Sequence, residues 1–151
     1  MVAEDTAFAD RSLAFTLARA QYAVRLSIRD EMQRLDINID QYFALAALGA
    51  KYMSVTEIDE LGRIYDRSFD QACALELERR ALVDFATANG DSKLQLTAAG
   101  RQLMWQLLAI SKDAETTLLG QFEEWEAQWL KAALQRIGNT RPTVVPDDGS
   151  T

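Results

Sequence analysis

The chain has 151 residues, of which 48% are hydrophobic and 26% are charged, and its formal net charge is −7. This is the length and composition of one ordinary globular domain, and no apolar run is long enough to span a bilayer. The negative charge excludes a protein that coats nucleic acid or membrane by electrostatics alone, because such binding depends on neutralised phosphates.

The residues needed for several kinds of catalytic and metal site are missing. Cys73 is the only cysteine, and there is no histidine. An intramolecular disulfide, a zinc site built from Cys and His, and catalysis by a Ser-His or Cys-His pair are therefore excluded. The sequence also has no glycine-rich phosphate loop, and its 23 Asp and Glu residues are scattered over polar helix faces. We predict that the protein is not an enzyme and holds no metal or cofactor.

The two ends of the chain differ in composition from its middle. The segment MVAEDTAFADRS is acidic and lacks the basic and apolar regions of a signal peptide, so a cytoplasmic protein is expected. Residues 138–151 contain both prolines and show no periodicity. We predict an N-terminal arm over residues 1–9, a single domain over residues 10–137 and a flexible tail over residues 138–151.

A long helix is predicted over residues 10–36, because apolar residues recur there at three- and four-residue steps. Two apolar stripes follow it: Leu17, Val24, Ile28 and Leu35 on one side, and Phe15, Tyr22 and Leu26 on another. A helix with two apolar sides needs two sets of neighbours, which fits a core on one side and a subunit interface on the other.

One N-terminal capping pattern predicts the next three helices. In this pattern a short polar residue is followed three residues later by Glu or Gln. The pairs are Asn38 with Gln41, Ser54 with Glu57, and Ser68 with Gln71. They predict helices over residues 39–51, 55–65 and 69–81. Only a short turn separates the last two, so these helices cross at a large angle, as in a helix-turn-helix.

The pattern changes after Val83. The stretch VDFATANGDSKLQLT places Asn89 and Gly90 between two short segments, which predicts a β-hairpin over residues 84–96. A helix-turn-helix followed by a hairpin is a winged helix. Thr97 caps the next helix, and Gly120 separates it from a last helix that ends near residue 137. The predicted fold class is therefore mostly α with a small β-hairpin wing.

Four motifs occur in a recognisable order along this chain. They are INIDQYFALAAL, SVTEID, DRS followed by LERRALV, and LQLTAAGRQL. Their order and spacing resemble the MarR family of bacterial transcription regulators, in which these segments enter the helix-turn-helix, enclose its recognition helix and connect the wing to the next helix. The resemblance spans residues 10–137.

The resemblance implies a cytoplasmic homodimer that represses or adjusts transcription by binding double-stranded operator DNA. Its dimerisation helices would be residues 10–36 and 98–137, and residues 54–97 would form the helix-turn-helix and wing. It also implies a pocket for a small-molecule effector between the dimerisation and DNA-binding parts. Tyr22, Tyr42 and Trp105 are candidates to line that pocket, and ordinary packing is the alternative role for each.

The candidate DNA-contacting residues lie in and around the predicted recognition helix and wing: Arg67, Ser68, Phe69, Gln71, Ala72, Arg79, Arg80 and Lys93. Base readout uses Arg or Lys for guanine and Asn or Gln for adenine, and the leading turn of the helix offers only Gln71. The arginines, together with Arg63, are candidates for phosphate contacts. The alternative is ion pairing with Glu60, Glu76 and Glu78 at helical spacing.

The charge of this region supports a second interpretation of function. Residues 54–93 hold five basic and nine acidic side chains, a net charge of −4 where phosphates would approach. The fold could therefore serve a protein partner instead of DNA, as an anti-repressor or a mimic of nucleic-acid charge, with exposed Phe69 and Leu75 in contact with the partner.

Cys73 has two interpretations. It could be a redox sensor, because oxidation within a recognition helix would disturb DNA docking. A reactive thiol needs positive neighbours, however, and Asp70 and Glu76 lie one turn away. An inert, partly buried thiol is the favoured interpretation.

Overall fold

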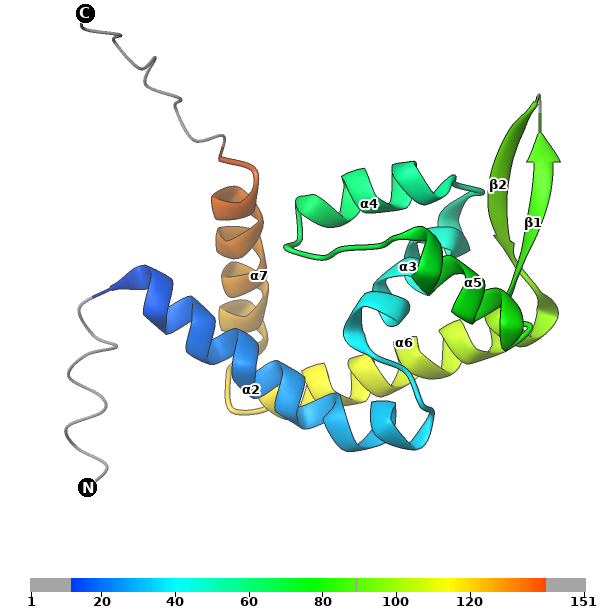
Figure 1. The fold of residues 1–151 in the computed structure, drawn as a ribbon. Coiled ribbons are helices and arrows are strands. Elements are labelled where there is room, and N and C mark those ends of the chain that lie inside the picture. Colours follow the sequence, from blue (N-terminus) through cyan, green and yellow to red (C-terminus); the bar gives the residue numbers. More distant parts are fainter. Residues whose placement is uncertain (1–11, 89, 141–151) are drawn as a thin grey trace, which may run out of the picture. The chain divides into compact units, whose positions relative to one another are not determined.

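The computed structural model describes residues 12–88 and 90–140. The chain divides into two compact units between Glu115 and Thr116. Figure 1 shows the order of the elements. They are α2 (Leu13–Arg34), α3 (Ile39–Ala50), α4 (Val55–Arg63), α5 (Gln71–Arg79), β1 (Val83–Ala88), β2 (Asp91–Leu96), α6 (Ala98–Leu119) and α7 (Glu124–Gly138).

Two of the three predicted capping boxes are confirmed. The Asn38 side chain accepts from the backbone N–H of Gln41, and the Gln41 side chain accepts from the N–H of Asn38, at the start of α3. Ser54 and Glu57 make the same reciprocal pair at the start of α4. Each pair satisfies backbone donors that the first turn of a helix leaves without an intrahelical partner.

The third predicted capping box is wrong. The helix α5 begins at Gln71 and not at residue 69, and its N-cap is Asp70, whose side chain accepts from the N–H of Cys73 at 2.8 Å. The reason lies ten residues earlier, where the Asp59 carboxylate accepts from the N–H of Phe69 at 3.1 Å. This bond and the burial of the Phe69 side chain hold Phe69 outside the helix.

The predicted hairpin is confirmed, and one residue outside it, Met53, also pairs with its second strand. The strands β1 and β2 pair antiparallel, with Val83 opposite Leu96 and Phe85 opposite Leu94. Met53, just before α4, makes an isolated bridge to Leu94 with hydrogen bonds in both directions. The wing is therefore attached to the start of α4 as well as to the end of α5.

The core of the first unit lies where α3, α5, the hairpin base and α6 meet (Figure 1). Its fully buried large side chains are Leu45, Ile58, Leu77, Leu94, Leu107 and Val83. At the hairpin base, α6 approaches the backbone so closely that a Cβ on Gly100 would lie 1.9 Å from the carbonyl oxygen of Leu82. Only glycine fits this contact, which holds the end of α5 against the start of α6.

Some sequence predictions concern residues outside the described part of the chain. The predicted arm over residues 1–9 lies entirely outside it, as does most of the predicted tail, whose first residue, Gly138, ends α7. In the described ranges, no helix combines the length and apolarity that crossing a membrane requires.

Candidate nucleic-acid interface

The helix α5 has one packed side and one exposed side. Ala74 and Leu77 face the core and are fully buried. On the other side lie exposed residues that we call the α5 outer face: Gln71, Ala72, Leu75, Glu78 and Arg79. Leu75 retains 50% of its accessible surface, so among the described residues this face is open to solvent.

Two predicted contact residues need correction. The Phe69 side chain is only 3% exposed, so the predictions that it reaches a DNA groove or a protein partner are wrong. Its ring packs in the hydrophobic core beneath the start of α5. Ser68 is exposed but lies before the helix and caps nothing in it, because Asp70 takes that position.

The surface arginines, Arg63 and Arg79, make ion pairs along their own helices. Arg63 pairs with Asp59 at 3.0 Å, and Arg79 donates twice to the Glu76 carboxylate, at 2.6 and 2.9 Å. Their side chains remain 74% and 71% exposed. Exposed pairs of this kind contribute little to stability, because solvent screens both charges.

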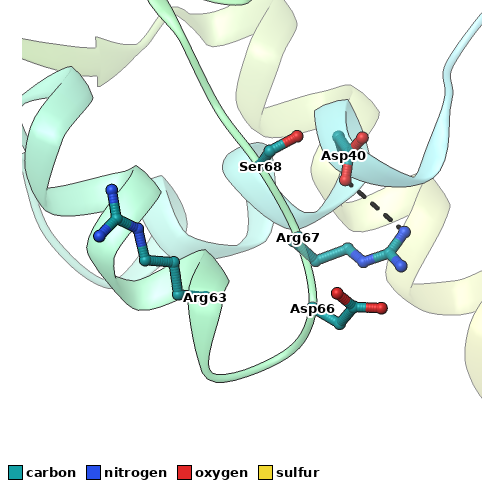
Figure 2. Close-up of a pocket in the computed structure, with 5 residues that line it drawn as sticks. All are labelled: Asp40, Arg63, Asp66, Arg67 and Ser68. Atoms are coloured by element: carbon teal, nitrogen blue, oxygen red, sulfur yellow. Dashed lines mark ion pairs between the residues drawn. The ribbon is translucent and has the colours of Figure 1, made fainter.

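Arg67, the first of two internal arginines, turns inward to α3. Its side chain is 14% exposed and pairs with Asp40 at 3.6 Å. Figure 2 shows the two groups pointing toward one another, while the guanidinium of Arg63 points away from them. The surface pocket of about 290 Å³ around them is lined by Asp40, Arg63, Asp66, Arg67 and Ser68. The geometry therefore gives Arg67 a structural partner and leaves it little surface for a phosphate.

Arg80, the second internal arginine, joins α5 to the end of α2. Its guanidinium donates to the backbone carbonyls of Leu35 at 3.1 Å and Asp36 at 2.5 Å. These carbonyls follow the last turn of α2, where a helix leaves acceptors without partners and favours a positive charge. Arg80 therefore fixes the C-terminal end of the candidate recognition helix to the first long helix.

The wing carries one basic side chain, and it too is paired. Lys93 lies 3.4 Å from the Glu57 carboxylate of α4 and is half-buried. This pair connects β2 to the first turn of α4 across the sheet edge. Asp91, near the tip of the wing, is exposed and acidic.

Four carboxylates of this region have lowered pKa values: that of Glu76 is lowered first by its hydrogen bonds from Arg79, and the other three are Asp59, Asp70 and Glu57. The first cause for these three is a backbone N–H donor: that of Phe69 for Asp59, that of Cys73 for Asp70 and that of Ser54 for Glu57. Hydrogen bonds to the charged form stabilise it. The fold therefore favours the charged form of these carboxylates.

The three residues predicted to line an effector pocket differ in their burial. Tyr42 is half-buried, with its hydroxyl 2.8 Å from that of Ser111 on α6. Tyr22 and Trp105 are 62% and 64% exposed. The packing role is therefore the better description of Tyr42, and an effector contact by the other two stays a prediction.

A different pocket, of about 260 Å³, lies beside the connection from α2 to α3. Its lining contains two arginines, two amides and four aliphatic side chains and no carboxylate: Arg25, Ile28, Arg29, Met32, Gln33, Ile37, Asn38 and Ile39. Positive charge above an apolar floor suits a small organic anion. Sequence periodicity could not find this pocket, because its floor is made by the tertiary contact of α2 with residues 37–39.

Cys73 has the environment of an inert thiol. It is half-buried, and burial raises its pKa, with the nearby Asp70 carboxylate adding to the effect. A raised pKa lowers the fraction of reactive thiolate at neutral pH. Among residues 12–88 and 90–140, no three Cys, Asp or Glu side chains form a group that could hold a metal ion.

The elements and their order define a winged helix-turn-helix of the MarR type. No protein-family model matches the sequence, and no curated protein matches it either. Solved structures do match. A MarR family regulator from Rhodococcus sp. RHA1 is 18% identical, with a TM-score of 0.72, over 85% of this chain and 95% of that one.

Two other similar structures contain DNA. MepR of S. aureus in complex with DNA is 19% identical, with a TM-score of 0.69, over 85% of this chain and 95% of that one. A MarR family protein of Mycobacterium tuberculosis in complex with DNA is 21% identical, with a TM-score of 0.67, over 84% and 98%. The latter protein is also known in complex with salicylic acid. These similarities confirm the predicted MarR-like winged-helix fold.

Proposed function

We propose that this chain is a homodimeric, cytoplasmic transcriptional regulator of the MarR type that binds operator DNA. The observation that carries the proposal is the exposed α5 outer face on a winged-helix scaffold that, in two similar proteins, is seen bound to DNA. A helix presented in this way enters the major groove, and the wing contacts the flanking backbone.

The acidic charge of residues 54–93 constrains how DNA would be held. Arg63, Arg79 and Lys93 supply the phosphate contacts by exchanging their carboxylate partners for phosphates. Arg67 and Arg80 stay in their internal contacts. Three contacts per protomer make about six in a dimer, which corresponds to a salt slope near −5.

Dimerisation is supported by the second apolar stripe of α2. Tyr22 and Leu26 are exposed, whereas Ile28 and Met32 of the same helix are buried. The helix α7 also exposes large apolar side chains, including Trp125 and Trp129. Apolar surface of this extent is typical of an interface between subunits.

Effector control is supported by the pocket that contains Arg25 and Arg29. The same connection between α2 and α3 that forms its floor holds the carbonyls to which Arg80 is bonded. A ligand that shifts this connection would shift α5, and a changed separation of two α5 helices lowers affinity for correctly spaced half-sites. Titration calorimetry with salicylate on wild type and Arg25→Gln tests this point, and equal heats from both would contradict it.

A second candidate function is contact with a protein partner in place of DNA. It is favoured by the net charge of −4 over residues 54–93 and by the carboxylate or carbonyl partner of every basic side chain there. Such a partner would present basic groups around an apolar contact for Leu75.

A gel-shift assay on DNA from the protein's own promoter region separates the two functions. We expect a specific shift at about 50 mM salt that weakens strongly at about 200 mM. Arg63→Ala and Arg79→Ala should each weaken it, whereas Arg34→Ala, which removes a paired surface arginine of α2, should not. No shift at low salt would reject DNA binding and favour the protein partner.

A further inference from the structure

We propose that α5 reads A·T-rich half-sites, with Gln71 contacting adenine and with Ala72 and Leu75 contacting thymine methyl groups. This inference rests on the proposed function, because it concerns the same surface. It adds the class of DNA sequence that the surface prefers.

The first two turns of the α5 outer face present one amide and two apolar side chains. Gln71 and Leu75 are four residues apart, so they lie one above the other, and Ala72 lies beside them. All three are exposed. The N-terminal residues of a recognition helix are the ones that reach base edges. Glutamine bonds bidentately to the N6 and N7 atoms of adenine, and small apolar side chains contact the thymine methyl.

The basic side chains that could bond to guanine lie away from the leading turns of α5. Guanine readout needs a guanidinium or ammonium near its O6 and N7 atoms. Arg67 precedes the helix and is paired with Asp40 in the body of the unit. Arg79 lies eight residues beyond Gln71, about 12 Å along the helix axis.

The acceptors for cytosine also lie away from the leading turns of the outer face. Cytosine presents its N4 amino group as a donor, which a carboxylate can accept. Asp70 is the N-cap and accepts from the N–H of Cys73. Glu78, the carboxylate of the outer face, lies seven residues beyond Gln71, about 10 Å along the helix axis. Adenine and thymine are therefore the bases that the leading turns can recognise.

The test begins with selection of binding sites for the full-length protein from a random duplex library. We expect half-sites rich in A·T pairs where α5 docks. In a competition gel shift on the selected duplex, replacing a contacted adenine by 7-deazaadenine, which lacks the N7 acceptor, should weaken wild type about ten-fold. Replacing contacted thymines by deoxyuridine removes only the methyl group and should weaken it about two- to four-fold each.

Variants then assign each effect to a side chain. Gln71→Ala should lose the sensitivity to 7-deazaadenine, and Leu75→Ala should lose part of the sensitivity to deoxyuridine. Gln106→Ala, an exposed glutamine on α6, is the matched control and should behave as wild type. All three positions are at the surface, so circular dichroism should show folded proteins.

The outcomes separate this inference from the proposed function. Selection of G·C-rich half-sites, sequence-independent binding, or base-analogue effects that persist in Gln71→Ala and Leu75→Ala would overturn the readout while leaving DNA binding in place. A complete lack of DNA binding at low salt would overturn both.

Discussion

The packed side and the outer face of α5 carry similar residue types but differ in burial. On the packed side, Leu77 lies in the core, and Arg80 holds the end of the first long helix. On the outer face, Leu75 and Arg79 are the counterparts, and both remain exposed. The comparison teaches that residue type alone does not decide whether a side chain of this helix is buried or exposed. The position of the residue relative to the core decides this, and paired substitutions can test the comparison.

The largest contrast is expected between the two leucines. Leu77→Ala removes a fully buried side chain and should lower the free energy of unfolding by about 2–5 kcal/mol. Leu75→Ala should change it by less than about 0.5 kcal/mol, because the side chain is half-exposed and outside the core. Urea unfolding followed by circular dichroism measures both. Similar losses in the two variants would show that the outer face is packed in solution.

Substitution of Arg80 should lower the stability more than substitution of its neighbour Arg79. Arg80→Ala deletes two charged hydrogen bonds to carbonyls and should cost about 1–2 kcal/mol of unfolding free energy, reduced from the buried value because the group is partly exposed. Arg79→Ala should change the free energy of unfolding much less, because its ion pair with Glu76 is exposed to solvent.

In DNA binding, substitution of Arg79 should have a larger effect than substitution of Arg80. Arg79→Ala should reduce the salt slope of a gel shift by about one per protomer. Arg80→Ala should leave that slope unchanged. A reduced slope in Arg80→Ala would mean that this side chain leaves its carbonyl partners and binds a phosphate.

Substitution of Ala81, immediately after α5, should have a smaller effect and should stabilise the fold. Its φ of 56° is in the left-handed region, which costs alanine more than glycine. We expect Ala81→Gly to raise the unfolding free energy by about 0.5–1 kcal/mol. The matched control, Ala72→Gly within α5, should lower it by about 1 kcal/mol. Loss of stability in Ala81→Gly would show that this turn is not strained.

The smallest effects concern pH. Asp59 and Asp70 have pKa values below their unfolded values, so the stability they confer is present above the unfolded pKa near 4. It is lost as the pH falls through the folded pKa. Thermal unfolding midpoints should therefore drop on acidification below about pH 5. Asp59→Asn should flatten this dependence, whereas Glu60→Gln, on the same helix, serves as the control. An unchanged acid profile in Asp59→Asn would reject the role of that carboxylate.

Sequence patterns between residues a few positions apart predicted most of the fold. The predictions that were wrong concern residues whose partners lie further away along the chain. The capping boxes at Asn38 and Ser54 involve residues only three apart, and both formed as expected. The pattern at Ser68 looks the same in sequence, but the bond from Phe69 to Asp59 prevents it. Asp70, two residues later, supplies the cap instead.

The candidate site was less predictable for the same reason. Arg67 and Arg79 look equivalent in sequence as candidates for phosphate contacts. One pairs with Asp40, distant along the chain, and the other with Glu76, three residues away. Only the second pair follows from helical spacing. The exposure of Gln71 and Ala72 could be predicted once α5 was placed, whereas the internal bonds of Arg80 could not.

The single, poorly reactive thiol of Cys73 makes the chain convenient for distance measurements. At neutral pH its raised pKa slows alkylation relative to an exposed cysteine. With Cys73 replaced by Ala, a cysteine introduced at Thr87 on the wing would be the single thiol that accepts a spin label. Electron spin resonance could then report the separation of two wings in a dimer, with and without DNA or a small anion.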